Sequence, residues 1–438
     1  MAELVSAMAS PMLPPNHPQR VVLNDEVHAR PPEALVAPLR LSFLALFAHG
    51  TAREQERQHV RDLAARFDAA PPAPGANHYS ADLGPFRLKW EQHTEFSRYK
   101  LIVAGAGDDP FAEPALAAVP ADWLARLAGE VMVATNVALV RAGDAPPDPE
   151  TIATRLFAGN SLIGATVAGG AAVALTDFRI GGDGFSRYLV LDRSLTPRQA
   201  GRTIQRLLEI DTYRMLALLA LPMARELTPF LSGCERELAQ ITAALARSGD
   251  QDEPGLLDRL TRLQAAIESR ESDSSFRFGA AAAYDALVQR RIAELREERI
   301  EGLPTFREFT GRRLAPAMDT CRAAAARQGS LSQRMARATQ LLSTRVAVAR
   351  QRQNQAVLES MNRRARLQLR LQETVEGLSI AAITYYVVGL VGYAAKGLKA
   401  GGVALDPDLV MGASIPLVVL LVALGVRRIR KMVTRVLP

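Results

Sequence analysis

Several residue types are scarce in this 438-residue chain, and each scarcity narrows what the protein can do. Aromatic residues make up only 5% of the sequence, which argues against the stacking platforms that bind single-stranded nucleic acid. Only five of the 53 basic residues are lysine, so the net charge of +7 reflects an arginine enrichment that we attribute to a G+C-rich genome. We therefore expect no nucleic-acid partner.

Cysteine is also rare, and the two cysteines fit a reducing compartment. Cys234 and Cys321 both fall in predicted helices, so we expect buried free thiols. The first 20 residues lack a basic start followed by an apolar core, which predicts that no secretory signal is present. The bulk of the chain should then stay in the cytoplasm.

Long uncharged runs occur only near the C-terminus. Residues 377–395 contain no charge over 19 residues, enough for a helix of about 28 Å that crosses a bilayer. Residues 409–426 give 18 more, with Pro416 inside, which a membrane span tolerates. The linker between them is rich in glycine and contains Pro407, a composition typical of a short reversal. The two runs predict a transmembrane hairpin in the lipid bilayer.

The flanking charges predict its orientation. Residues 345–372 carry seven arginines against one acid, Glu359, and the tail 427–438 carries five basic residues and no acid. The linker is balanced, with Lys396 and Lys399 against Asp406 and Asp408. Because positive charge is retained on the cytoplasmic side, we expect a multi-pass protein of the bacterial inner membrane with both termini in the cytoplasm.

A polar stripe marks the first predicted span. Ser379, Tyr386 and Tyr393 recur every seven residues, and Gly389 lies close to the same face. Such a face turns toward a partner helix in lipid, either within the hairpin or at a subunit interface or pore lining. A pore built from two spans per chain requires several subunits, so the second interpretation predicts a homo-oligomer. Asp406 and Asp408 are the linker acids that would attract cations.

The rest of the chain divides by its hydrophobic periodicity. Residues 226–372 are helical almost throughout, with breaks expected at 249–255, 272–275 and 302–304. They predict an antiparallel bundle of coiled-coil character, whose last helix continues as a stalk into the first span. Residues 35–225 look mixed, with strands predicted at 39–47, 86–90, 96–103, 131–140, 171–180 and 187–191, and helices at 52–67, 111–128 and 197–219.

This pattern gives a fold class: an α+β cytoplasmic domain, then a long-helix bundle and stalk, then a C-terminal two-helix transmembrane hairpin. The expected boundaries are 1–34 for an N-terminal segment with acidic and histidine residues, 35–225 for the α/β domain, 226–372 for the bundle and stalk, and 373–438 for the hairpin and its basic tail. The glycine-rich run 181–185 lies between two predicted strands and is interpreted as a hairpin turn.

Two polar clusters are candidates for chemistry, since all six histidines lie in the first 93 residues. The first joins acids, an imidazole and a guanidinium in a segment that ends in two prolines. The second alternates along a predicted strand, so its side chains should share one face. The clusters comprise Asp25, Glu26, His28 and Arg30, and Glu91, His93 and Glu95.

Imidazoles and carboxylates together are ligands for a divalent cation, here through His28, His93 and Glu95, and they also suit an acid–base pair. The alternative is a solvated surface of salt bridges. A divalent cation is the one cofactor that these residues suggest. Enzymatic activity that uses them is the third hypothesis for the function.

Three stretches carry a resemblance to a known family. They are the run Asn24-Asp25-Glu26-Val27-His28-Ala29-Arg30-Pro31, the run Trp90-Glu91-Gln92-His93-Thr94-Glu95-Phe96, and the run Leu195-Thr196-Pro197-Arg198-Gln199-Ala200-Gly201-Arg202. With these motifs the chain resembles the bacterial domain-of-unknown-function 3422 family over nearly its full length. The resemblance implies an uncharacterised membrane-anchored protein and supplies no mechanism.

The order of parts is also similar to that of CorA-type magnesium channels, which join a cytoplasmic α/β domain, a long stalk and two C-terminal spans. The Gly-Met-Asn signature of those channels is absent, and Gly392-Tyr393-Ala394-Ala395-Lys396 stands in its place. The first hypothesis is an oligomeric CorA-like cation transporter or channel. The second is a membrane-anchored scaffold or sensor without transport, and the third is a metal-dependent enzyme that uses the His28 and His93 clusters.

Overall fold

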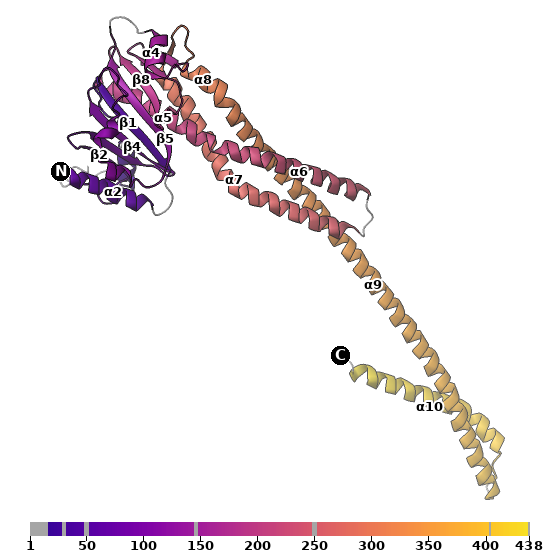
Figure 1. Ribbon diagram of the computed structural model, residues 1–438. Coiled ribbons are helices and arrows are strands. Elements are labelled where there is room, and N and C mark those ends of the chain that lie inside the picture. The colour runs from indigo at the N-terminus through magenta and orange to yellow at the C-terminus, as the bar shows by residue number, and fades with distance from the viewer. Residues whose placement is uncertain are drawn as a thin grey trace. The chain divides into compact units, whose positions relative to one another are not determined.

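The computed structural model describes residues 16–28, 32–47, 52–143, 148–247, 252–402 and 404–436. It contains an N-terminal α/β domain with one mixed sheet, followed by long helices and a C-terminal helix (Figure 1). The chain divides into two compact units. One comprises 1–243 and 259–337, and the other comprises 244–258 and 338–438.

Nine strands form the sheet in the order β2-β3-β4-β1-β5-β8-β7-β6-β9. The neighbouring strands pair antiparallel except for β5 and β8, which run parallel. The strands are β1 Leu39–Phe47, β2 His78–Asp82, β3 Arg87–Gln92, β4 Phe96–Ala104, β5 Glu130–Arg141, β6 Ile163–Val167, β7 Ala172–Thr176, β8 Ser186–Asp192 and β9 Glu298–Arg299.

Eleven helical segments are described with the sheet. The short ones are α1 Arg20–His28, α2 Ala52–Arg66, the 3-10 turn η1 Ala115–Ala118, α3 Ala121–Leu124, α4 Pro149–Leu156 and α8 Phe306–Arg313. The long ones are α5 Pro197–Leu218, α6 Ala220–Arg247, α7 Glu253–Leu295, α9 Ala315–Ala400 and α10 Pro407–Val436. Thr196 begins α5 with a capping box to Gln199, as the Thr-Pro signal predicts.

The two faces of the sheet differ in character. Along β3 and β4, Leu88, Trp90, Tyr99 and Leu101 point to one face and pack with α2 in an apolar cluster. The alternate residues point to the other face and include Lys89, Glu91, Arg98 and Lys100, all buried. Buried charges of this density are rare on a sheet and require partners from the covering helices.

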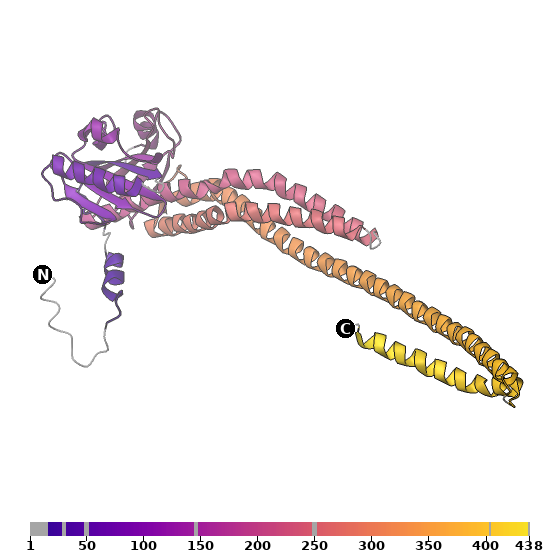
Figure 2. The same ribbon diagram turned by 90° about the horizontal axis from the view of Figure 1, so that it is seen from below.

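The helices after the domain bury apolar residues such as Leu231 of α6, Leu260 of α7 and Met335 of α9, and polar contacts add to this packing. In the first unit, Arg327 of α9 forms an ion pair of 2.5 Å with Glu235 of α6. Ser274 of α7 donates to the side-chain oxygen of the buried Gln328 of α9 at 3.1 Å. The helix α9 continues without interruption over 86 residues (Figure 2).

Candidate functional site

The first predicted cluster lies on α1 and just beyond it. Asp25 is exposed, and Asn24 donates a long hydrogen bond of 3.5 Å to its carboxylate. The backbone of Glu26 and of His28 is part of α1, but their side chains are not described. Arg30 lies outside the described residues. The contribution of His28 to a metal site therefore stays a prediction.

The second predicted cluster is not a strand face. The strand β3 ends at Gln92, and His93 and Thr94 form a turn before β4 begins at Phe96. His93 stacks on Phe96 with the ring centroids 4.6 Å apart. The predicted strand was wrong beyond Gln92, because a tight turn ends the alternation before His93 and Glu95.

The carboxylates of this cluster bind basic partners. Glu95 forms an ion pair of 2.8 Å with Arg277 of α7 and accepts a hydrogen bond of 2.6 Å from Tyr284. Glu91 pairs with Arg98 across the sheet. In the described part of the chain no group of three or more His, Cys, Asp and Glu residues is placed to hold a metal ion. The geometry therefore gives the metal interpretation of His93 and Glu95 no support.

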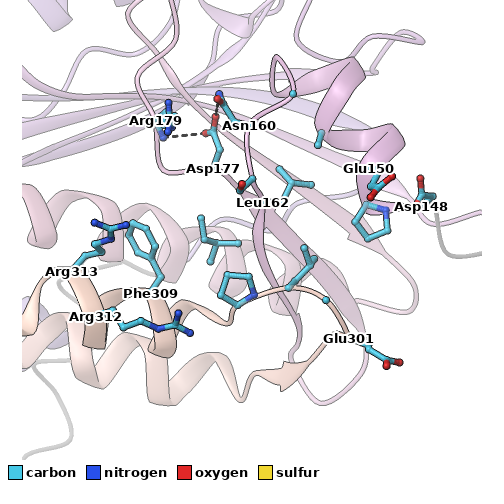
Figure 3. A pocket seen from close by; sticks show the side chains of 18 residues that line it. Asp148, Glu150, Asn160, Leu162, Asp177, Arg179, Glu301, Phe309, Arg312 and Arg313 are labelled. Carbon is cyan, nitrogen blue, oxygen red and sulfur yellow. Dashed lines mark hydrogen bonds between the residues drawn. The ribbon is translucent and has the colours of Figure 1, made fainter.

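A cleft of about 860 Å³ lies elsewhere in the α/β domain (Figure 3). The start of α4, the segment before β6, the segment after β7 and the helix α8 line it. Its charged and polar lining residues are Asp148, Glu150, Asn160, Ser161, Asp177, Arg179, Glu301, Arg312 and Arg313. This cleft could not be predicted from the sequence, because its residues come from separate segments and none of these segments carries a motif.

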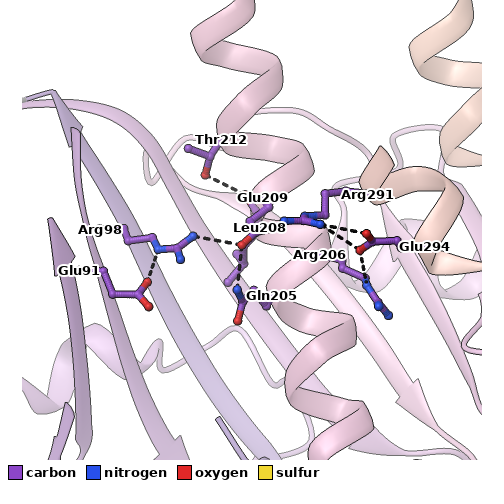
Figure 4. A network of polar contacts seen from close by, with 9 residues as sticks. All are labelled: Glu91, Arg98, Gln205, Arg206, Leu208, Glu209, Thr212, Arg291 and Glu294. Carbon is purple, nitrogen blue, oxygen red and sulfur yellow. Dashed lines mark hydrogen bonds and ion pairs between the residues drawn. The ribbon is translucent and has the colours of Figure 1, made fainter. Parts of the chain in front are cut away.

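The charged face of the sheet holds a network of ion pairs (Figure 4). Arg98 of β4 contacts Glu91 of β3 and lies 3.3 Å from Glu209 of α5. Glu209 also pairs with Arg291 of α7. Arg291 and Arg206 both bind Glu294, at 3.0 and 3.1 Å. The network thereby fastens α5 and α7 to the sheet.

The electrostatics follow from burial and these partners. Burial would raise the pKa of Glu91, but Arg98, Lys100 and Lys89 lower it to about 2. Arg98 and Arg291 likewise keep the pKa of Glu209 below its usual value against the opposing effect of burial. Each carboxylate is therefore ionised and engaged by arginine at neutral pH. These carboxylates suit a structural role that holds α5 and α7 on the sheet. A general base would need a carboxylate that is free to accept a proton.

The predicted stripe of the first span is exposed. Tyr386 and Tyr393 are 71% and 75% exposed, and Ser379 is exposed with its hydroxyl bonded to the carbonyl of Val375. The buried residues of this segment, Thr384, Val388, Gly392 and Ala395, lie on the other side of α9, and Gly392 faces Met411 of α10. Both tyrosines are open on the surface of this chain, and the choice between packing inside the hairpin and a subunit interface or pore lining stays a prediction.

The hairpin also contains a groove of about 720 Å³, lined by Tyr386, Gly389, Tyr393 and residues of α10 such as Met411. The linker acids lie at the start of α10. Asp406 and Asp408 are both exposed, and the side chain of Asp406 accepts from the backbone N–H of Asp408 at 3.1 Å. Asp406 thus caps the N-terminus of α10, a local role that leaves its carboxylate open to solvent.

These observations define a class of protein: an α/β domain on one mixed sheet, joined to long helices, of which three are long and apolar enough to cross a membrane. The chain belongs to the family described as "Protein of unknown function (DUF3422)", which matches residues 15–433. A search of curated proteins and a search of solved structures each gave no match.

Proposed function

We propose that the protein is a homo-oligomer of the cytoplasmic membrane that conducts a cation through its C-terminal hairpin, with the α/β domain in the cytoplasm. One observation carries the proposal. The helix α9 continues unbroken from the bundle into an apolar segment, and a second apolar helix, α10, follows it. This order of parts is the CorA-like layout.

The hydropathy of the hairpin supports membrane insertion. The most apolar 18-residue window of the helix 407–429 has a mean hydropathy of 2.6, and only 6% of this window is buried within the chain. The helix 306–400 reaches 1.7, with 17% buried. Leu378, Leu390 and Leu421 are among the side chains left uncovered. Exposed apolar surface on this scale fits a lipid environment.

The third apolar helix, 197–247, fits a different role. A third of its most apolar window is buried. Within it, α5 places Ile204, Leu207 and Leu208 in the core of the α/β domain, and Glu209 in the ion network. A segment that carries buried ion pairs to a sheet suits the cytoplasmic domain, so we propose two spans.

The stalk part of α9 supports assembly. Val357, Met361, Leu371, Val375 and Leu378 recur at helical spacing on one face, and all are more than half exposed. Arg352, Arg363, Arg366 and Arg370 lie on the opposite face, and Arg364 interrupts the apolar stripe. An apolar stripe opposite a basic one is the pattern of a helix that packs against copies of itself. Packing of the stalks would bring the stripe of Tyr386 and Tyr393 around one axis.

Cation conduction is the furthest step of the proposal. The exposed face Ser379, Tyr386, Gly389 and Tyr393 supplies hydroxyl and backbone oxygens to a pore lining, and Asp406 and Asp408 supply negative charge at its outer end. These residues differ from the Gly-Met-Asn signature of CorA-type channels, so we leave the identity of the ion to experiment.

Two measurements test the proposal. The mass of the full-length protein in lipid nanodiscs should correspond to several chains, and a monomer would contradict the channel. Proteoliposomes should take up Mg²⁺ or K⁺, with uptake reduced in Tyr386→Ala and Asp406→Asn. Leu421→Ala is the control, because Leu421 is 60% exposed on α10 and does not line the groove that contains Tyr386 and Tyr393. An oligomer without flux of either ion would favour the scaffold or sensor.

A further inference from the structure

The cleft of Figure 3 has a polarised charge distribution. Arg179 follows β7, and Arg312 and Arg313 lie in the last turn of α8. In the view of Figure 3 these arginines lie on one side together with Asp177, and Asp148, Glu150 and Glu301 lie on the other. A volume of about 860 Å³ is within the range that encloses a small-molecule ligand.

The arginines of the cleft keep hydrogen-bond donors available. Among the described residues, no carboxylate lies within 4.0 Å of the guanidinium of Arg179 or Arg313. Arg312 approaches Glu308 only at 3.9 Å, and Glu308 has a closer partner in Arg299 at 2.9 Å. These guanidinium groups can therefore bind an external anion.

A helix C-terminus is a common reason for arginine in a last turn, because its free carbonyls attract positive charge. That reason does not apply to α8. The N–H of Leu314 bonds to Thr310, and the N–H of Met318 bonds to Leu314, so the helical hydrogen bonds continue into α9 apart from the one that Pro316 cannot donate to Arg312. The arginine pair at the end of α8 is thus left without this structural explanation.

The polar residues between the charged sides are held in place. The Asn160 amide donates to Asp177 at 2.9 Å, and the other oxygen of Asp177 accepts from the backbone of Arg179 at 3.1 Å (Figure 3). Neither bond uses the side-chain oxygen of Asn160. That oxygen can accept a hydrogen from a hydroxyl or amino group of a ligand.

The backbone beside the cleft is strained in two places. Ala158 and Phe178 have φ values of 51° and 54°, in the left-handed region that side chains with a Cβ disfavour. Phe178 is held there by its ring, which stacks on Phe309 of the cleft wall at 4.6 Å. Its two neighbours, Asp177 and Arg179, both line the cleft. Such strain gathers at ligand sites because the fold must hold the functional groups in fixed positions.

We propose that this cleft binds a small organic phosphate. The phosphate would lie against Arg179, Arg312 and Arg313, whose planar forks match its oxygens. The remainder of the ligand would offer hydroxyl or amino groups to Asn160 and to the carboxylates opposite. Those carboxylates would repel an extended polyanion, so the cleft selects a small molecule over a nucleic acid or a membrane surface.

Isothermal titration of the full-length protein in detergent tests this site. The probes are AMP, ATP and glucose 6-phosphate, with inorganic phosphate, adenosine and glucose as references. At least one organic phosphate should bind more tightly than all three references. Each lost guanidinium contact should weaken that binding about ten-fold or more, so Arg179→Gln and Arg313→Gln are the test variants.

The matched control is Arg322→Gln, since Arg322 is an arginine of α9 that pairs with Asp319 and does not line the cleft. Binding to this variant should be unchanged, and circular dichroism should show that all three variants fold. The proposal is overturned if none of the organic phosphates binds. It is also overturned if inorganic phosphate binds equally well, which means an adventitious ion only, or if Arg179→Gln and Arg313→Gln leave the affinity intact.

Discussion

Gly201 is the residue whose replacement the structure opposes most clearly. It lies in the first turns of α5, where the segment before β1 crosses the helix and Leu35 donates to the Pro197 carbonyl at 3.0 Å. A Cβ at position 201 would overlap the backbone carbonyl of Glu33. The glycine of the Thr-Pro-Arg-Gln-Ala-Gly motif is thus needed for close approach of two backbones.

We predict that Gly201→Ala lowers the free energy of unfolding by about 2 kcal/mol or more, because backbone rather than a flexible side chain must move. The measurement is thermal unfolding of the full-length protein followed by circular dichroism. Gly233→Ala is the matched control, since nothing lies within 4 Å of a Cβ placed at this helical glycine. Equal melting temperatures for the two variants would contradict the predicted contact.

Lys100 gives a prediction about pH. It is buried on the charged face of the sheet, and the described residues place no carboxylate within ion-pair distance of its amine. Burial and the nearby Arg98 lower its pKa to about 7. The unfolded chain holds this proton up to about pH 10. Because the unfolded state binds more protons between these values, stability should rise as pH increases from about 7 to 10.

Replacing the lysine should remove this dependence. We predict that Lys100→Met stabilises the protein at pH 7 by about 1–4 kcal/mol and flattens the rise in melting temperature above pH 7. The exposed Lys396 provides the control substitution Lys396→Met, which should leave the pH profile unchanged. A profile for Lys100→Met that still rises as in the wild type would show that other groups are responsible.

At the scale of elements, periodic sequence patterns predicted strands and helices correctly, but the positions of breaks between helices were predicted less well. The strand 39–47 and the helix that begins at Pro197 were confirmed, because an unbroken apolar run and a capping signal mark them. The predicted helix 111–128 is instead two short segments, η1 and α3, each preceded by a proline, Pro114 or Pro120. The break expected at 272–275 is absent from α7, where Ser274 is buried and bonds to the Arg270 carbonyl and to Gln328 of α9.

The sites were harder to predict than the elements. Glu91 was identified as a candidate, but its partner Arg98 lies across a turn, and Glu209 and Arg291 come from helices more than 100 residues away. Pairing of this kind depends on sheet register and helix docking, which the sequence of one chain does not reveal. The same limit applies to the cleft between α4 and α8.

The hairpin gives a prediction at the element scale. A Cβ on Gly392 would lie 2.8 Å from the sulfur of Met411 on α10, so a larger residue must displace the Met411 side chain from the contact between the two helices. We predict that Gly392→Leu destabilises the hairpin and speeds tryptic cleavage at Lys396 and Lys399. A loss of about 1.4 kcal/mol in hairpin stability would raise the cleavage rate on the order of ten-fold. Gly412→Leu is the control, because nothing lies within 4 Å of a Cβ there. Equal cleavage rates in the two variants would refute the close contact.

At the scale of the whole molecule, the proposed topology can be tested by labelling. In a background without Cys234 and Cys321, Ala404→Cys places a thiol in the linker and Ser360→Cys places one on the stalk. We predict that a membrane-impermeant thiol reagent labels position 404 but not position 360 in spheroplasts, since arginine-rich flanks stay in the cytoplasm. Both positions should react after the membrane is permeabilised, and labelling of 360 alone would mean the opposite orientation.

The two native cysteines have a consequence for following the molecule in time. Cys234 of α6 and Cys321 of α9 are both buried as free thiols, and burial raises the pKa of each. A thiol in this state reacts with an alkylating reagent only when its helix opens, because the thiolate is the nucleophile and it is neither formed nor accessible in the closed fold. The rate of alkylation at each cysteine, measured by mass spectrometry, therefore reports how often the helix around it opens, for α6 and for α9 separately.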